Sequence, residues 1–256
     1  ARLVVPEEVS FDRALSVGQP DGYSHTGNPN GKLSGGKVQQ GITSPSPDPL
    51  IQSQIDQAAT DNDNETEDCV TAAGFDECGT LGSGVYYFGG DATVDGDLGF
   101  NTTDGNVTFV VDGDFDIGGS DITVTDNSSN GVEYYINGSF DLQGNPEIGT
   151  DPEPIQAERN VFYVAEGFLD GSAGDGNPTI EAIVYAPNAD VVTNGNPTLR
   201  GGFVTNTLET GGNANVEPDP ALAELGFEIR IAGGSGQNPI TYLHVSENVV
   251  EFRFDG

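Results

Sequence analysis

Apolar residues occupy every second position in a series of short segments in the middle of the chain. In the clearest of these, residues 84–94, 107–117 and 132–142, a glycine keeps the same phase relative to the apolar positions. Alternation with a period of two predicts β-strands that bury one face. The apolar anchors of successive segments lie 20 to 29 residues apart, at Tyr86, Phe109, Tyr134, Tyr163, Tyr185 and Thr205.

A repeat of this length, with strand periodicity inside each unit, predicts a solenoid in which each coil buries its apolar row against the next. We therefore expect an all-β protein built around a right-handed parallel β-helix of about six coils over residues 84–216. A β-sandwich is the alternative, because short strands joined by turns fit the same pattern. The expected interior residues are Tyr86, Phe109, Val111, Tyr134, Ile136, Tyr163 and Phe203.

A second repeat supports the solenoid. Gly-Asn-Pro occurs at residues 176–178 and 195–197, Gly-Asn-Ala follows at 212–214, and residues 144–146 are a candidate earlier copy. This spacing places Asn177, Asn196 and Asn213 at one corner of successive coils, where side-chain amides can hydrogen-bond along the stack.

The flanking segments differ from this centre. Residues 1–47 have the composition of an extended linker, and residues 48–83 contain a short amphipathic helix, expected as a lid over one end, and a cysteine loop. The β-helix is expected over residues 84–226, ending in a short capping helix that begins at Asp219-Pro220. Residues 227–256 are expected to add a C-terminal strand extension, whose long alternating strand covers residues 241–254.

The strongly negative net charge of the chain excludes some classes of binding partner. The chain has 41 acidic and 8 basic side chains and a formal net charge of -33. Binding to nucleic acid or to an anionic membrane surface is therefore not expected, because both partners attract clustered Lys and Arg. An acid-rich, lysine-poor surface is typical of a halophilic protein, in which salt screens the self-repulsion. No apolar run has the length of a membrane helix.

Three features favour an extracellular or cell-surface location. Cys69 and Cys78 are the only cysteines, and a disulfide between them is preferred over two free thiols or a zinc site. The chain also starts at Ala1 without Met, as a processed secreted protein does. N-glycosylation sequons, which belong to exported surfaces, begin at Asn64, Asn101, Asn106, Asn127 and Asn137.

One acidic cluster has two interpretations. Asp112, Asp114 and Asp116 alternate along one segment, and stacking of coils brings Asp91 near Asp114. The four residues form either a calcium site or a solvated acidic face of a halophilic protein. Calcium is the only cofactor considered.

Catalysis is not expected. Polysaccharide-degrading enzymes use the β-helix fold, but Arg159 and Arg200 are the only basic residues of the coils, and Arg200 is expected at a turn. No catalytic residue is assigned. Tyr87 and Tyr135 alternate with the inward positions, so they form either an outward stacking platform for carbohydrate, as in an adhesin, or ordinary strand packing.

Several stretches resemble a known family. They are residues 176–190, the Gly-Asn-Pro copy at 195–197, residues 212–222 and the tail at 240–245. These resemble an uncharacterised family of haloarchaeal surface proteins, in which a right-handed β-helix domain commonly follows a type IV pilin-like membrane segment. The resemblance covers residues 48–250 and implies an exported, cell-surface protein with no known catalysis. The sequence departs from this family at its N-terminal region, where residues 1–47 contain no pilin-like apolar helix, so the resemblance leaves the mode of anchoring open.

The two ends of the chain suggest how copies assemble. The N-terminal segment is apolar, and the C-terminal strand has an edge that needs covering. We expect a structural subunit of an extracellular filament or surface assembly, in which the N-terminal segment of one copy adds a strand to the next copy. The alternatives are an N-terminal segment folded onto its own β-helix, and an adhesin that binds surface glycans or neighbouring cells. The assembly residues are Leu3, Val4, Val5, Val9, Phe11, Tyr242, Val245, Val249 and Phe252.

Overall fold

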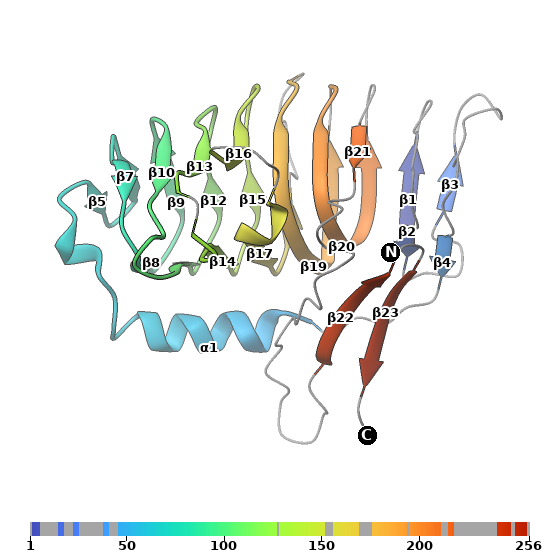
Figure 1. The fold of residues 1–256 in the computed structure, drawn as a ribbon, viewed down its shortest axis with the longest axis horizontal. Coiled ribbons are helices and arrows are strands. Elements are labelled where there is room, and N and C mark those ends of the chain that lie inside the picture. Colours follow the sequence, from blue (N-terminus) through green and yellow to red (C-terminus); the bar gives the residue numbers. More distant parts are fainter. Residues whose placement is uncertain are drawn as a thin grey trace.

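The structure is a computed structural model of the 256-residue chain. It describes residues 2–5, 15–17, 23–25, 38–40, 46–126, 128–151, 156–168, 176–193, 195–210, 215–217, 240–246 and 249–254. The described residues form a parallel β-helix of about five turns, with one α-helix along its side (Figure 1). The predicted parallel β-helix is therefore confirmed, and the β-sandwich alternative is wrong.

Each coil contributes strands to three parallel sheets, which we call faces A, B and C. Face A contains β8 (Gly84–Phe88), β11 (Val107–Val111), β14 (Val132–Ile136) and β17 (Asn160–Val164). Face B contains β6 (Gly74–Asp76), β9 (Ala92–Asp95), β12 (Phe115–Asp116), β15 (Phe140–Asp141) and β18 (Gly167–Phe168). Face C contains β7 (Gly79–Leu81), β10 (Leu98–Phe100), β13 (Ile122–Val124) and β16 (Glu147–Thr150). Two longer strands, β19 (Thr179–Thr193) and β20 (Thr198–Thr210), run through all three faces, and β21 (Asn215–Glu217) continues face C.

The inward row of face A follows the predicted register for its first three strands. Phe109 pairs with Tyr86 on one side and with Tyr134 on the other, and all three side chains are buried. Of the other predicted interior residues, Val111 and Ile136 are fully buried and Phe203 packs against the same core.

At β17 the prediction is wrong by one residue. Tyr134 pairs with Phe162, whereas Tyr163 pairs with Tyr135 and Tyr185 on the outer side of face A. Every residue of β17 is buried, because both sides of face A are covered here. An uninterrupted apolar run carries no period-two signal, so the sequence could not show which residues point inward.

The solenoid starts earlier than predicted. Strand β6 already pairs with β9, so stacking begins at Gly74 and not at residue 84. Strand β5 (Val70–Thr71) pairs antiparallel with β6 and forms a hairpin at this end. The segment that was expected to be only a cap therefore contributes to the first coil.

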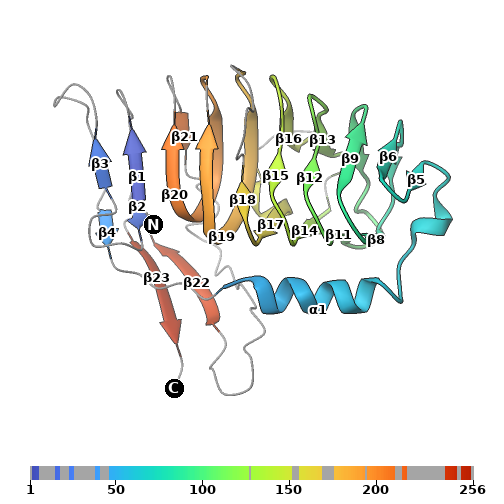
Figure 2. The ribbon, with the colours of Figure 1, turned by 180° about the vertical axis from the view of Figure 1, so that it is seen from behind.

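The helix α1 (Asp48–Ala58) is present, but it is not a lid over the end. Leu50, Ile51, Ile55 and Ala58 are buried against the outer side of face A. Both views show α1 running along the stack of coils (Figures 1 and 2). Within the described part of the chain, no helix is long and apolar enough to cross a membrane.

The terminal segments contain further strands, namely β1 (Arg2–Val5), β2 (Leu15–Val17), β3 (Tyr23–His25), β4 (Val38–Gln40), β22 (Ile240–Ser246) and β23 (Val249–Phe254). Strand β1 adds in parallel to β20 of the same chain, and β3 pairs with β1. Strands β22 and β23 pair antiparallel with each other, so the predicted single long strand is instead a hairpin. The predicted capping helix after Asp219 lies outside the described residues.

Candidate functional site

The acidic corner between faces A and B holds three of the four aspartates considered for calcium, Asp91, Asp112 and Asp114, whereas Asp116 lies in β12 of face B. The backbone N–H of Asp114 donates to Asp91 Oδ1 at 3.0 Å, and the N–H of Ser139 donates to Asp114 Oδ1 at 2.8 Å. Each carboxylate therefore accepts a hydrogen bond from a backbone N–H group of the next coil. Without the carboxylate, that N–H group would lack a partner at the turn. These two carboxylates form a ladder along the corner.

The other two aspartates of this group have separate partners. Asp112 Oδ1 accepts a hydrogen bond from Asn137 Nδ2 at 2.9 Å, and Asp116 Oδ1 accepts one from the Gly118 N–H at 2.7 Å. Among the residues that the structure describes, no three His, Cys, Asp or Glu side chains lie close enough together to hold a metal ion. The geometry thus gives Asp91, Asp112 and Asp114 a role in coil stacking, which neither sequence interpretation included, whereas the Asp116 bond is local to its own turn.

The same arrangement recurs between faces B and C. Asp97 Oδ1 accepts the N–H of Asp121 at 3.1 Å, and Asp121 Oδ1 accepts the N–H of Glu147 at 2.7 Å. The signal for these ladders is present in the sequence, because the participating residues lie one coil length apart. It was hidden by the large number of other acidic residues.

The Gly-Asn-Pro corner is confirmed for its described copies. Asn177 Nδ2 donates to Asn145 Oδ1 at 3.2 Å, and Asn196 Nδ2 donates to Asn177 Oδ1 at 2.8 Å. The candidate copy at residues 144–146 therefore belongs to the ladder, whereas Asn213 lies outside the described residues. A Cβ atom at Gly176 would collide with the Gly144 carbonyl oxygen, so only glycine allows this stacking distance.

A buried polar cluster links three coils, and the sequence did not predict it. Arg159 is 2% exposed and pairs with the carboxylate of Asp126 at 3.0 Å. Its guanidinium also donates to Thr102 Oγ1 at 2.9 Å and to the Asn130 carbonyl at 2.8 Å. Burial raises the pKa of Asp126, but hydrogen bonds from Ser128 and Thr102 outweigh that effect and hold this pKa well below its ordinary value. The guanidinium of Arg159 therefore joins neighbouring coils through this buried cluster.

Arg200 also differs from its prediction. It lies in β20 and not at a turn, and its Nη1 atom is 3.0 Å from Glu181 Oε1. Residues 181 and 200 are register partners in β19 and β20. The two basic residues of the coils are thus both held in ion pairs with carboxylates.

The two tyrosines considered as a stacking platform lie on the side of face A that α1 covers. Tyr135 is 5% exposed and stacks on Tyr163, with ring centroids 4.9 Å apart. Burial raises the pKa of the Tyr135 hydroxyl, and the neighbouring Glu133 charge raises it further. Tyr87 is half-buried and packs against the same helix-covered cluster. The pair is therefore not an open stacking surface, and the interpretation as β-packing is correct for Tyr135.

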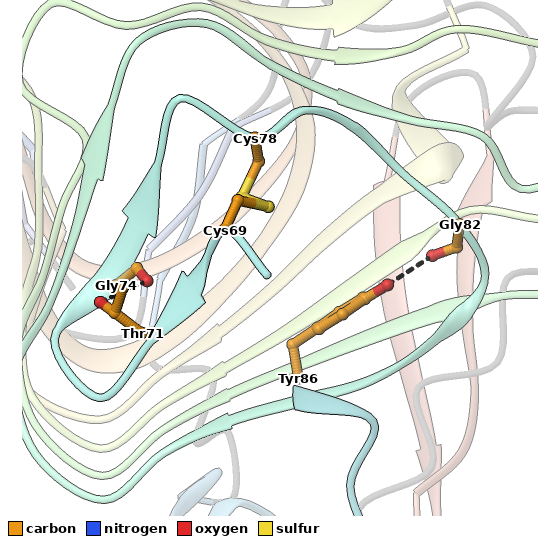
Figure 3. Close-up of a disulfide and its surroundings, with 6 residues drawn as sticks. All are labelled: Cys69, Thr71, Gly74, Cys78, Gly82 and Tyr86. Carbon is orange, nitrogen blue, oxygen red and sulfur yellow. Dashed lines mark hydrogen bonds between the residues drawn. A yellow bond between two sulfur atoms is a disulfide. The ribbon is translucent and has the colours of Figure 1, made fainter. Parts of the chain in front are cut away.

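The first end of the solenoid is closed by residues of the same chain. The N–H and carbonyl of Val85 bond to Asp63, and the N–H and carbonyl of Tyr87 bond to the side chain of Asn64. The predicted disulfide is confirmed: Cys69 and Cys78 are joined, with Cα atoms 5.1 Å apart. Figure 3 shows it beside the β5–β6 hairpin. The same view shows the hydroxyl of Tyr86, which donates to the Gly82 carbonyl at 3.1 Å.

The predicted glycosylation sites lie in different environments. Asn101 and Asn106 are exposed, Asn64 and Asn137 are half-buried, and Asn127 lies outside the described residues.

The predicted assembly residues fall into two groups. Leu3, Val4 and Val5 belong to β1 on the edge of β20, the cis arrangement that was one of the two alternatives, and Val9 and Phe11 lie outside the described residues. The C-terminal group lies in the β22–β23 hairpin, at Tyr242, Val245, Val249 and Phe252.

Comparisons with known proteins give a family and no function. Neither the curated proteins nor the solved structures include a match to the chain. A family model matches residues 30–225, which include every complete coil described above. The chain belongs to this uncharacterised family, described as domain of unknown function DUF7305.

Proposed function

We propose that the chain is a structural subunit of an extracellular surface assembly of a halophilic archaeon, in which copies join head to tail by strand addition. The proposal assigns the chain no catalysis and no nucleic-acid partner. Its partner is a second copy of the same chain.

The observation that carries the proposal is the difference between the two ends of the solenoid. At the first end, Asp63 and Asn64 occupy the edge of β8. At the other end, the edge of β20 is occupied by β1, a strand from a distant part of the sequence. A solenoid edge is a template for another strand, and here the strand that fills it is separated from the helix α1 by residues 6–47.

An exchange of β1 between copies would use the same β1–β20 pairing that the single chain already makes. The register Leu3 with Leu208 and Val4 with Glu209 is the same whether β1 comes from its own chain or from a neighbour. Exchange of an identical element is a low-cost route to assembly. If the donor of one copy fills the edge of the next, the contact is heterologous and extends into an open polymer.

Two further features support an extracellular halophilic setting. The Cys69–Cys78 disulfide is typical of oxidising compartments. The net charge of -33 suits a surface that stays hydrated in concentrated salt, which screens its self-repulsion.

A cross-link between register partners tests the proposal. We expect the Leu3→Cys/Leu208→Cys variant, oxidised in molar salt, to form an interchain ladder on a non-reducing gel. The Leu3→Cys single variant is the control and should give no ladder. Removal of residues 1–17 should leave the β-sheet circular dichroism unchanged and abolish assembly in sedimentation. Cross-links that form only within one chain at high protein concentration, or normal assembly of the truncated protein, would overturn the proposal.

A further inference from the structure

The corner between β10 and β11 presents one sequon to solvent. In the sequon Asn101-Thr102-Thr103, the first and third side chains are exposed, whereas Thr102 is fully buried. The Thr103 N–H donates to Asn101 Oδ1 at 3.1 Å, which closes a local turn. Among described residues, Asn101 Nδ2 has no hydrogen-bond partner, so the atom that would carry a glycan is open.

The buried middle residue explains why this presentation is rigid. The Thr102 N–H donates to Asp126 Oδ2 at 2.5 Å, and its hydroxyl bonds to the Asn130 carbonyl at 3.1 Å and accepts from Arg159 at 2.9 Å. Thr102 thus anchors the turn in the buried polar cluster. Its two neighbours must then point away from the solenoid.

Asn64 is in the opposite situation. Its Nδ2 donates to the Tyr87 carbonyl at 2.6 Å, while its Oδ1 accepts the Tyr87 N–H at 2.9 Å. Because both bonds go to one residue, the donated hydrogen is the one on the same side as Oδ1. A glycosylated side-chain amide is a secondary amide that strongly prefers the trans form, which puts the sugar carbon in that same position. A glycan on Asn64 would therefore remove the bond that closes the edge of β8.

The other two described sequons lie between these extremes. Asn106 is exposed, but Thr108 of its sequon is half-buried in β11. Asn137 is half-buried, and its Nδ2 donates to Asp112 at 2.9 Å. Neither combines an open amide nitrogen with an exposed hydroxyl residue two positions later.

We propose that Asn101 is the preferred N-glycan acceptor among the sequons that the structure describes and that Asn64 is not modified, although both carry the motif. The co-substrate class is a polyisoprenyl-phosphate-linked oligosaccharide. Asn101 Nδ2 forms a bond to the anomeric carbon, the bond from that carbon to the phosphate oxygen breaks, and the lipid phosphate leaves with the electron pair. The Nδ2 proton passes to a base of the transferring enzyme. The inference rests on the extracellular part of the proposed function.

Site-resolved mass spectrometry tests this inference on the full chain secreted from a halophilic archaeal host with N-linked glycosylation. We expect a glycan on the peptide that contains Asn101 and an unmodified Asn64. Asn101→Gln and Thr103→Ala should each remove one glycan mass, and Thr103→Ser should retain it. Asn64→Gln should leave the glycan mass unchanged and lower the melting temperature.

An unmodified Asn101 in the secreted, folded chain would overturn the inference, and so would Asn64 modified to the same extent. The outcome is separate from that of the cross-linking experiment, because glycan occupancy is read on single chains. A glycosylated chain that does not polymerise would contradict the proposed assembly alone.

Discussion

Face A of the solenoid is buried on both sides, and the two sides are built differently. On the inner side, Phe109 and Tyr134 pack among rings and branched side chains supplied by all three faces. On the outer side, Tyr135 and Tyr163 stack on each other under α1, and the Tyr135 hydroxyl donates to Glu133 at 2.9 Å. The inner side is completed by the coils themselves, whereas the outer side depends on one 11-residue helix.

Because of this difference, the inner side of face A contributes to the stability of the whole stack, whereas the outer side contributes to local stability. Each inner residue touches neighbours in the coils before and after it, so its loss weakens the whole stack. The outer layer is held by Leu50, Ile51, Ile55 and Ala58, and it can open without unstacking the coils. We therefore expect inner substitutions to lower global stability and outer substitutions to act locally.

The largest effect is expected from the inner layer. Phe109 is completely buried, and Phe109→Ala should lower the free energy of unfolding by about 3 to 5 kcal/mol through the cavity it leaves. Chemical denaturation in molar salt measures this change. A loss below about 1 kcal/mol would mean that the interior is not closely packed.

A smaller, local effect is expected from the outer layer. Ile51 of α1 is completely buried against face A, and Ile51→Ala should lower stability by about 2 kcal/mol, the low end for such a change, because the helix can shift into the space. Hydrogen exchange should speed up in α1 and remain slow in β11. The matched control is Ser53→Ala, an exposed position of the same helix, which should have little effect. Equal acceleration in both elements would contradict the two-layer comparison.

Alkaline pH should weaken the inner layer through Tyr86. Burial, with a smaller contribution from Glu67, raises the pKa of this tyrosine from 10.0 to about 12. Below pH 10 the hydroxyl is protonated in both states and pH has no effect through it. Between pH 10 and 12 only the unfolded chain ionises, so stability falls by about 1.4 kcal/mol per pH unit for this group. Tyr86→Phe should reduce the measured slope by that amount, and an unchanged slope would contradict the assignment.

The smallest effect is expected at the corners, outside both layers. Asp114→Ala removes the acceptor for the Ser139 N–H and should lower stability by about 1 kcal/mol. Asp114→Asn retains a side-chain oxygen and should have less effect. Asp95→Ala is the control, because this exposed carboxylate has no side-chain hydrogen bond to a described residue. Thermal denaturation of the three variants should rank them in this order, and equal losses would favour a purely solvated role for Asp114.

The structure also shows where prediction from the sequence ends. The Gly-Asn-Pro corner was predictable, because residues 177 and 196 repeat at the coil length and bond to their nearest copies. The Arg159 cluster was not, since its partners lie up to 57 residues away and share no motif. The sequence correctly indicated that stacking brings Asp91 near Asp114, but it did not show that the partners of these two carboxylates are backbone N–H groups of the next coil.

The sequence by itself determined the solenoid, its coil length and the inward positions of β8, β11 and β14, because stacking repeats a local pattern of one buried side per strand. Only the tertiary structure decided what covers the outer side of face A. The amphipathic pattern of residues 48–58 showed that the helix has an apolar face, but not which surface that face would meet. Once α1 lay on face A, both sides of β17 were buried and the alternation that identifies inward residues disappeared. The position of β1 on β20 was decided in the same way, because backbone pairing between distant strands depends on which edges the folded chain leaves accessible.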